Sequence, residues 1–308
     1  MLSRRLASTA VLVTVMVLLV WLDFWLATDA VFGRAGVVLV GLSLILGVVT
    51  AIEFSGLWKS EVGETPKCQS ATVMAIGTAL MIAVASIPAL WREYPADCAI
   101  GYFGWTVAGV IAALLVSFFA EARKFGDAPE VPGAVAGRIG LSVLVYVYLA
   151  MLFGFILPIR NLDQSNSLGL LAVILLIATV KASDGAAYFA GKSLGKRKLA
   201  PALSPGKTIE GSLAAPLGGC FAAAIVIFAV APLIFGMTVD RPWWFFIAYG
   251  VVVTAVGMVG DLAESLLKRD AQIKDSGSMI PGMGGLLDVL DSLVFAAPVT
   301  FLIWIATK

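Results

Sequence analysis

The sequence predicts an all-α polytopic membrane protein with about nine transmembrane helices. Of its 308 residues, 60% are hydrophobic and only 13% are charged, and its mean hydropathy is +0.98. Soluble domains are typically about 45–50% apolar and about 25% charged. Apolar stretches of about 20 residues, the length that crosses a bilayer as a helix, recur along the whole chain.

Nine stretches are long and apolar enough to span a bilayer. The first follows Arg4 and Arg5, and its apolar run is longer than the roughly 7–15 residues of a signal peptide core, so we expect an uncleaved helix. The sixth stretch is short and partly polar, which leaves eight or ten spans open. The predicted spans are approximately 6–27, 35–57, 71–91, 101–120, 138–158, 167–183, 211–236, 244–268 and 286–305.

The distribution of lysine and arginine predicts a cytoplasmic N-terminus. With nine alternating spans and the N-terminus inside, 16 of the 21 basic residues fall on the cytoplasmic side, as the positive-inside rule requires. A loop rich in glycine and proline around 125–137 suggests an N-terminal half of about four helices, 1–125, and a catalytic C-terminal half of about five, 138–308. The second half carries the predicted cytoplasmic loops 184–210 and 269–285.

Composition also restricts the chemistry. The chain has no histidine, and its three cysteines form no CxxC pair. Zinc sites and histidine-based catalytic groups are therefore not expected. The net charge of +1 gives no electrostatic reason to expect a nucleic-acid partner.

The first polar cluster lies in the predicted loop 184–210. Asp184 at the end of a span is placed to hold a cation, while Ser204 and Thr208 offer hydroxyls to phosphate oxygens. Alternatively, this loop only sets topology by meeting anionic lipid headgroups. Its bases are Lys192, Lys196, Arg197, Lys198 and Lys207.

Two further clusters flank the last predicted loop. Asp261, Glu264 and Lys268 share one helical face; the Glu264–Lys268 pair is equally well explained as structural, whereas Asp261 has no second base at helical spacing. After a glycine turn come Asp288 and Asp291. One acid would suffice to cap a helix, so two acids, with Asp261 from the preceding span, predict a carboxylate cluster suited to Mg²⁺.

The order and spacing of these residues resemble the phosphatidate cytidylyltransferases, or CDP-diacylglycerol synthases, over roughly residues 180–305. The chain departs from that family's pattern at Met283, where the family has histidine, and at Val289, where it has arginine. The matching positions are Asp184, Ser204, Lys207, Thr208, Glu210, Asp261, Glu264, Ser265, Lys268, Arg269, Lys274, Asp275, Gly284, Gly285, Asp288 and Asp291.

The resemblance implies transfer of the cytidylyl group of CTP to phosphatidate, giving CDP-diacylglycerol and pyrophosphate for phospholipid biosynthesis. It implies Mg²⁺, with a second cation left open, and a site on the cytoplasmic side of the bacterial inner membrane; a homodimer is an open alternative. The implied catalytic residues are Asp261, Asp288, Lys268 and Asp184, and the implied metal ligands are Asp261, Asp288 and Asp291. The implied substrate-binding residues are Ser204, Lys207, Thr208, Arg269, Lys274, Ser265, Gly284 and Gly285.

Two other functions remain open at this point. A CTP-dependent lipid-alcohol kinase would also need acids, bases and magnesium, together with a base beside the acceptor hydroxyl. A cation-coupled transporter would use Asp261 and Glu264 as an intramembrane relay.

Overall fold

The computed structural model describes most of the chain. Its described residues are 18–27, 35–58, 68–91, 94–95, 97–126, 131–162, 167–277, 279–280 and 284–307. Met283, one of the two departures from the family pattern, lies outside them.

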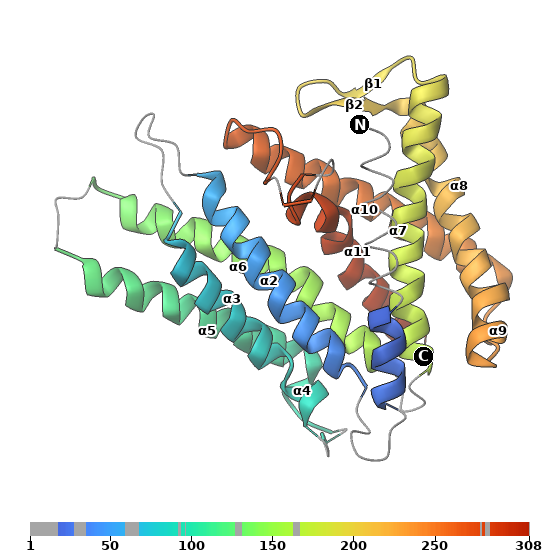
Figure 1. Cartoon of the computed structure of the whole chain (residues 1–308), viewed down its shortest axis with the longest axis horizontal. Coiled ribbons are helices and arrows are strands. Elements are labelled where there is room, and N and C mark those ends of the chain that lie inside the picture. The colour runs from blue at the N-terminus through green and yellow to red at the C-terminus, as the bar shows by residue number, and fades with distance from the viewer. Residues whose placement is uncertain are drawn as a thin grey trace. The chain divides into compact units, whose positions relative to one another are not determined.

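The described residues are mostly helical (Figure 1) and form only one short hairpin of strands, which confirms the all-α prediction. Seven of the predicted spans coincide with helices that are long and apolar enough to cross a membrane. The predicted spans 6–27 and 71–91 fall on the shorter apolar helices Leu18–Ala27 and α3, so the count of nine and the cytoplasmic N-terminus stay predictions. The helices are α2 (Val37–Leu57), α3 (Ala71–Ala85), α4 (Ile87–Leu90), α5 (Gly101–Lys124), α6 (Ala134–Arg160), α7 (Ser167–Leu194), α8 (Ile209–Ile225), η1 (Val226–Val230), α9 (Ala231–Phe235), α10 (Trp243–Asp270) and α11 (Leu287–Ala306).

The largest difference from the prediction is the length of α7. The helix continues to Leu194, beyond the predicted end at 183, so Asp184 lies inside a helix rather than at its end. Glycine permits this extension to pack closely on the start of α8: a Cβ at Gly195 would lie 2.8 Å from Thr208 Oγ1. Packing, which a hydropathy window does not detect, therefore extends the helix into the predicted loop.

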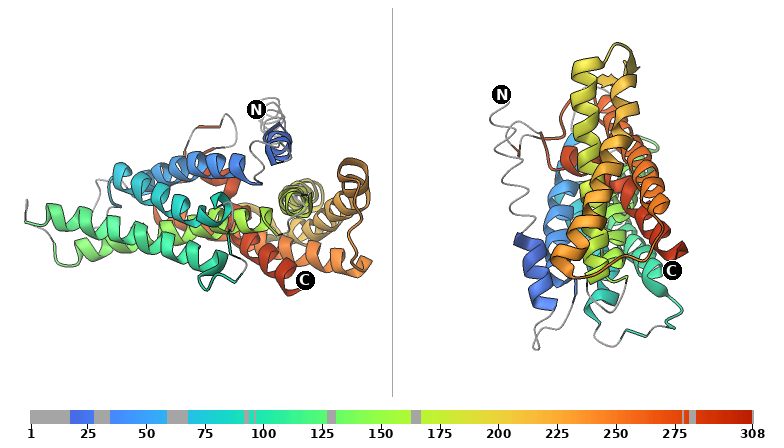
Figure 2. Two further views of the ribbon diagram at one scale, coloured as in Figure 1. Left: turned by 90° about the horizontal axis from the view of Figure 1, so that it is seen from below. Right: turned by 90° about the vertical axis from the view of Figure 1, so that its right-hand side faces the viewer.

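A short hairpin connects α7 to α8. Strand β1 (Lys198–Ala200) pairs antiparallel with β2 (Ser204–Thr208). Figure 1 and the right-hand view of Figure 2 show this hairpin at the ends of α7 and α8. The rest of the predicted loop 184–210 is thus ordered structure.

The chain divides into two compact units. One comprises Met1–Pro158 with Ala271–Val289, and the other comprises Ile159–Asp270 with Leu290–Lys308. The predicted halves, 1–125 and 138–308, describe membrane topology and stay a prediction. The segment 271–289 nevertheless groups with the N-terminal helices rather than with α10.

Within the first unit, polar side chains join helix ends that the predicted topology places on one side. Gln69, before α3, donates through Nε2 to Glu121 Oε1 near the end of α5, at 2.9 Å. Arg138, at the start of α6, donates through Nε and Nη2 to Glu121 Oε2 at 2.9 and 2.6 Å. These contacts agree with alternating spans.

Within the second unit, the first half of α7 is buried and α8 presents an apolar outer face. Leu213, Leu217 and Phe221, one helical turn apart, are 73%, 73% and 67% exposed. A contiguous exposed apolar stripe of this kind is expected where a helix faces lipid. The fully buried leucines of α7 are Leu170, Leu171, Leu175 and Leu176.

Candidate active site

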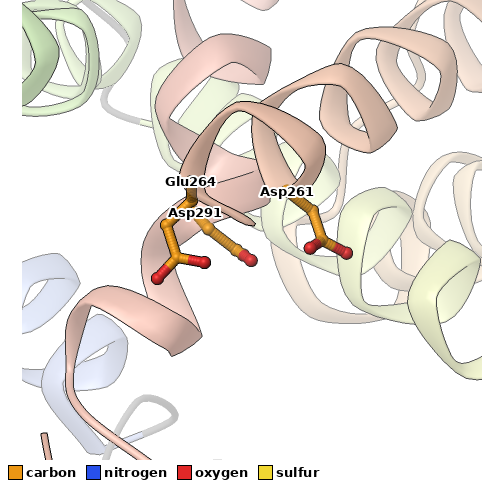
Figure 3. A group of neighbouring side chains, drawn as sticks. All are labelled: Asp261, Glu264 and Asp291. Carbon is orange, nitrogen blue, oxygen red and sulfur yellow. The ribbon is translucent and has the colours of Figure 1, made fainter. Parts of the chain in front are cut away.

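Three carboxylates from two helices converge in the second unit. Asp261 and Glu264 lie on α10, and Asp291 lies on α11. One carboxylate oxygen of each lies within 4.8 Å of the others (Figure 3). We call this group the acidic trio. The prediction that Asp261 and Asp291 belong to one carboxylate cluster agrees with this geometry.

Close backbone approach explains why these side chains meet. A Cβ at Gly260 would lie 2.6 Å from the carbonyl oxygen of Asp291. One turn earlier, a Cβ at Gly257 would lie 3.5 Å from the carbonyl oxygen of Ser292. Because Gly260 has no side chain, the backbone of α11 lies close to α10 next to Asp261. The acidic side chains of the two helices can then reach one another.

Two lysines partly neutralise the acidic trio. Lys207 Nζ lies 2.7 Å from Asp261 Oδ2, and Lys268 Nζ lies 2.5 Å from Glu264 Oε2. Glu264 is fully buried and Asp291 is 8% exposed. Buried carboxylates need counter-charges, because desolvation of an isolated ion is costly. Three carboxylates against two ammonium groups leave one negative charge in excess when all five are ionised.

The acidic trio is chemically suited to a hard cation. All three side chains offer oxygen, which Mg²⁺, Ca²⁺ and Mn²⁺ prefer over nitrogen or sulfur. Their oxygens are close enough to share one ion. The residues present therefore fit a divalent metal, and an excess of one negative charge favours its binding.

Asp184 lies at the edge of the same site. Its Oδ2 is 3.5 Å from Lys181 Nζ, one turn earlier on α7. Both Asp184 and Lys181 interact electrostatically with Asp291. The structure thus brings a second Asp–Lys pair toward the acidic trio.

The hairpin that carries Lys207 is held at several points. Thr208 Oγ1 caps α8 by accepting from Gly211 N at 3.1 Å. Arg269 Nε donates to the carbonyl oxygen of Leu203 at 3.1 Å. Glu210 accepts from the backbone amides of Lys196 and Arg197 at the base of β1. These bonds fix the position of Lys207; Thr208 and Arg269 contribute to the hairpin structure, and their binding of substrate stays a prediction.

The remaining predicted site residues lie in or near the turn before α11. Asp288 Oδ2 accepts from Ser276 N, Ser276 Oγ and Gly285 N at 3.1, 2.9 and 2.7 Å. Gly284 has a φ of +101°, a conformation that disfavours other residues. Asp288 thus stabilises this turn as a cap, and its role as a metal ligand stays a prediction. Of the other predicted residues, Lys274 is exposed, Ser265 is buried, and Ser204 pairs with Ala200.

Glu264 was missing from the predicted metal ligands. The sequence did place it on the same helical face as Asp261, but its neighbour Lys268 offered a sufficient structural explanation. The structure shows that Glu264 makes this ion pair and also belongs to the acidic trio. The i, i+3 spacing from Asp261 was the signal available in the sequence.

Sequence comparison places the chain among known proteins. A family model described as "Cytidylyltransferase family" matches residues 3–306. The chain belongs to this family.

Several relatives of this chain are named phosphatidate cytidylyltransferase. The Bacillus subtilis (strain 168) protein is 40% identical over 163 residues, which cover 52% of this chain and 56% of the relative. The Chlamydia muridarum protein is 35% identical over 209 residues, covering 67% and 63%. The Chlamydia pneumoniae protein is 28% identical over 312 residues, covering 100% and 93%. The alignments with the first two thus span between about half and two thirds of those relatives.

Family membership confirms the resemblance that the C-terminal motifs indicated. The matched residues 3–306 also include the N-terminal helices, which the motifs did not reach. In this member of the family, the acidic trio with Lys207 and Lys268 is the candidate active site.

Proposed function

We propose that this protein transfers the cytidylyl group of CTP to phosphatidate, producing CDP-diacylglycerol and pyrophosphate for phospholipid synthesis. Its family, the names of its relatives and its membrane-spanning helices support this proposal. The observation that carries it is the convergence of Asp261, Glu264 and Asp291 beside Lys207 and Lys268. Acids for a cation and bases for phosphate are thereby combined at one place on membrane-spanning helices.

The reaction joins two polyanions. A phosphate oxygen of phosphatidate attacks the α-phosphorus of CTP and forms a new P–O bond. The bond from the α-phosphorus to the bridging oxygen breaks, and pyrophosphate leaves. The attacking oxygen is already anionic at neutral pH, so the step needs no strong general base, which agrees with the lack of histidine.

The side chains of the site would divide this work by charge. Asp261, Glu264 and Asp291 would hold Mg²⁺, with Asp288 and Asp184 as further candidate ligands. When bound, the ion neutralises charge on the phosphate oxygens. Lys207 and Lys268 would bind phosphate oxygens of the two substrates, and ammonium groups held in place stabilise the charge that develops during transfer.

The membrane setting follows from the substrate. Phosphatidate resides in the bilayer, and CTP is a cytosolic nucleotide. The distribution of lysine and arginine predicts that the hairpin and the segment 269–285 lie on the cytoplasmic side. We therefore propose the bacterial inner membrane with the active site at its cytoplasmic face.

Purified protein with phosphatidate, Mg²⁺ and CTP labelled at a single phosphorus tests the reaction. Label from the α-phosphate should enter lipid, while label from the γ-phosphate should leave as pyrophosphate. Supplying diacylglycerol in place of phosphatidate, with γ-label entering lipid, would instead indicate a lipid-alcohol kinase. Absence of transfer by protein that folds and binds Mg²⁺ would contradict the proposal. Asp261→Asn serves as the matched inactive control.

A further inference from the structure

Glu53 lies in the second-last turn of α2, far in sequence from every residue assigned above, yet it contacts the start of α11. Its Oε1 accepts from Leu286 N and its Oε2 accepts from Leu287 N, both at 3.0 Å. Glu53 and both amides belong to the first compact unit. The carboxylate thus accepts from two amides at a helix N-terminus, where no partner is available within the helix.

A second carboxylate, Asp288 in the first turn of α11 itself, completes the arrangement. Asp288 Oδ2 accepts from Ser276 N and Gly285 N. Together, Glu53 and Asp288 bind the amides of Gly285, Leu286 and Leu287 in succession, so two anionic groups meet the positive end of the α11 dipole. Hydrogen bonds to ionised acceptors are stronger than neutral ones.

The space around Glu53 is shaped for this contact. A Cβ at Gly285 would lie 2.8 Å from Glu53 Oε2, and a Cβ at Gly277 would lie 3.0 Å from Glu53 Oε1. Glycines on both sides therefore let the turn close around the carboxylate. Two separate segments of the chain, at Gly277 and at Gly285, thus lie close to the Glu53 carboxylate, which argues against a chance surface contact.

The consequence concerns Asp291, which follows Leu287 by one helical turn on the same helix. We propose that Glu53 is a positioning residue that fixes the start and rotation of α11, and thereby the direction in which Asp291 enters the acidic trio. This inference rests on the proposed cation-dependent function. It gives the N-terminal helices, whose sequence carried no recognisable chemistry, a part in building the site.

The test compares Glu53→Gln with Asp23→Asn. Asp23 is a matched control, because it is also a carboxylate that accepts from two amides, Gly36 N and Val38 N, at the start of another helix in the same unit; Asp23 is buried and Glu53 is half-buried. Both variants remove one charge from a helix cap; Glu53 caps the start of α11, and Asp23 caps the start of α2. A loss seen equally in both variants would indicate general destabilisation and overturn the proposal.

Two measurements on the purified full chain report on position rather than on turnover. Hydrogen exchange in the peptide containing Leu286 and Leu287 should be about tenfold or more faster in Glu53→Gln. Mn²⁺ affinity, measured by electron paramagnetic resonance, should fall about 10- to 100-fold, the range found when residues that support metal ligands are replaced. Asp23→Asn should leave both unchanged. The Mg²⁺ concentration for half-maximal turnover should rise by the same factor as the Mn²⁺ dissociation constant.

The outcomes separate this inference from the proposed function. The positioning role is overturned if hydrogen exchange in Glu53→Gln is unchanged, or if exchange is faster but Mn²⁺ affinity equals that of the wild type. It is also overturned if the wild-type protein binds no Mn²⁺. Weaker Mn²⁺ binding in a protein that never turns over CTP supports the positioning role and refutes the function. If Glu53→Gln does not fold, Gly277→Ala, whose new Cβ would press on Glu53 Oε1, is measured in its place with the same criteria.

Discussion

Lys207 Nζ lies 2.7 Å from Asp261 Oδ2, and this contact joins the hairpin between α7 and α8 to the acidic trio on α10 and α11. The hairpin is held by the Thr208 cap, by Glu210 and by Arg269. A loop that could have served only as a topology determinant therefore delivers an ammonium group to the carboxylates. A lysine that could bind phosphate, placed beside carboxylates that could hold a cation, suits the proposed reaction between a nucleotide and an anionic lipid.

Replacing Lys207 tests whether it binds CTP. We expect Lys207→Ala to raise KM for CTP by about 10- to 100-fold, because a charge-assisted hydrogen bond contributes about 1.5–3 kcal/mol. Lys192→Ala, which removes an exposed lysine near the end of α7, should leave KM unchanged. Steady-state kinetics with varied CTP decides. A fixed KM with reduced kcat would mean that Lys207 serves only as a counter-ion of Asp261.

Replacing the acids one at a time tests which of them hold the cation. Asp261→Asn and Asp291→Asn should each lower Mg²⁺-dependent turnover by at least about 100-fold and weaken Mn²⁺ binding, because each removes a charged ligand. We expect Asp288→Asn to abolish turnover as well. Its amide oxygen can still accept from Ser276 and Gly285, so the turn should survive. Normal turnover in Asp288→Asn would leave Asp288 with the capping role alone.

The approach of α10 to α11 can be tested with two glycines. Gly260→Ala places a Cβ 2.6 Å from the Asp291 carbonyl oxygen, so the helices must separate and Asp291 must move away from Asp261. Gly257→Ala meets its nearest atom at 3.5 Å, an ordinary contact distance, and should stabilise the helix by up to about 1 kcal/mol.

Thermal unfolding and Mn²⁺ binding should therefore separate the two variants. We expect a lower melting temperature and weaker Mn²⁺ binding in Gly260→Ala, and neither change in Gly257→Ala. Equal behaviour would show that the two helices do not need this close contact.

Replacing the ion-pair partner of Glu121 tests a contact that should contribute to stability and not to cation binding. Glu121 is itself buried and accepts from the buried Gln69 and from the partly exposed Arg138 within the first unit. Arg138→Met leaves this carboxylate without its counter-ion and should destabilise the protein by about 3–5 kcal/mol. Denaturant unfolding of the purified protein measures the loss. At a temperature where the variant is folded, its half-saturating Mg²⁺ concentration should equal that of the wild type; a shifted value would extend the role of the N-terminal helices beyond Glu53.

Much of the fold could be predicted because crossing a bilayer imposes a strong local constraint. About 20 apolar residues and the bias of basic residues toward one side can be recognised without knowledge of any contact. The same approach failed where packing decides: α7 runs past Asp184 to Leu194 because Gly191 and Gly195 fit against Thr208. A hydropathy window marks where the apolar segment ends, whereas the helix ends where its packing partner ends.

By itself, the sequence determined the membrane class, the resemblance to the cytidylyltransferases and the candidate acids and bases, because these depend on residue type and on spacing along one helix. Only the tertiary structure decided which of them meet. It paired Lys207 with Asp261, joined Glu264 to Asp291 across two helices, gave Asp288 a turn to cap, and placed Glu53 against the amides that begin α11. Such contacts depend on how closely two backbones approach, and that distance is fixed by glycines and packed side chains distributed over the whole chain.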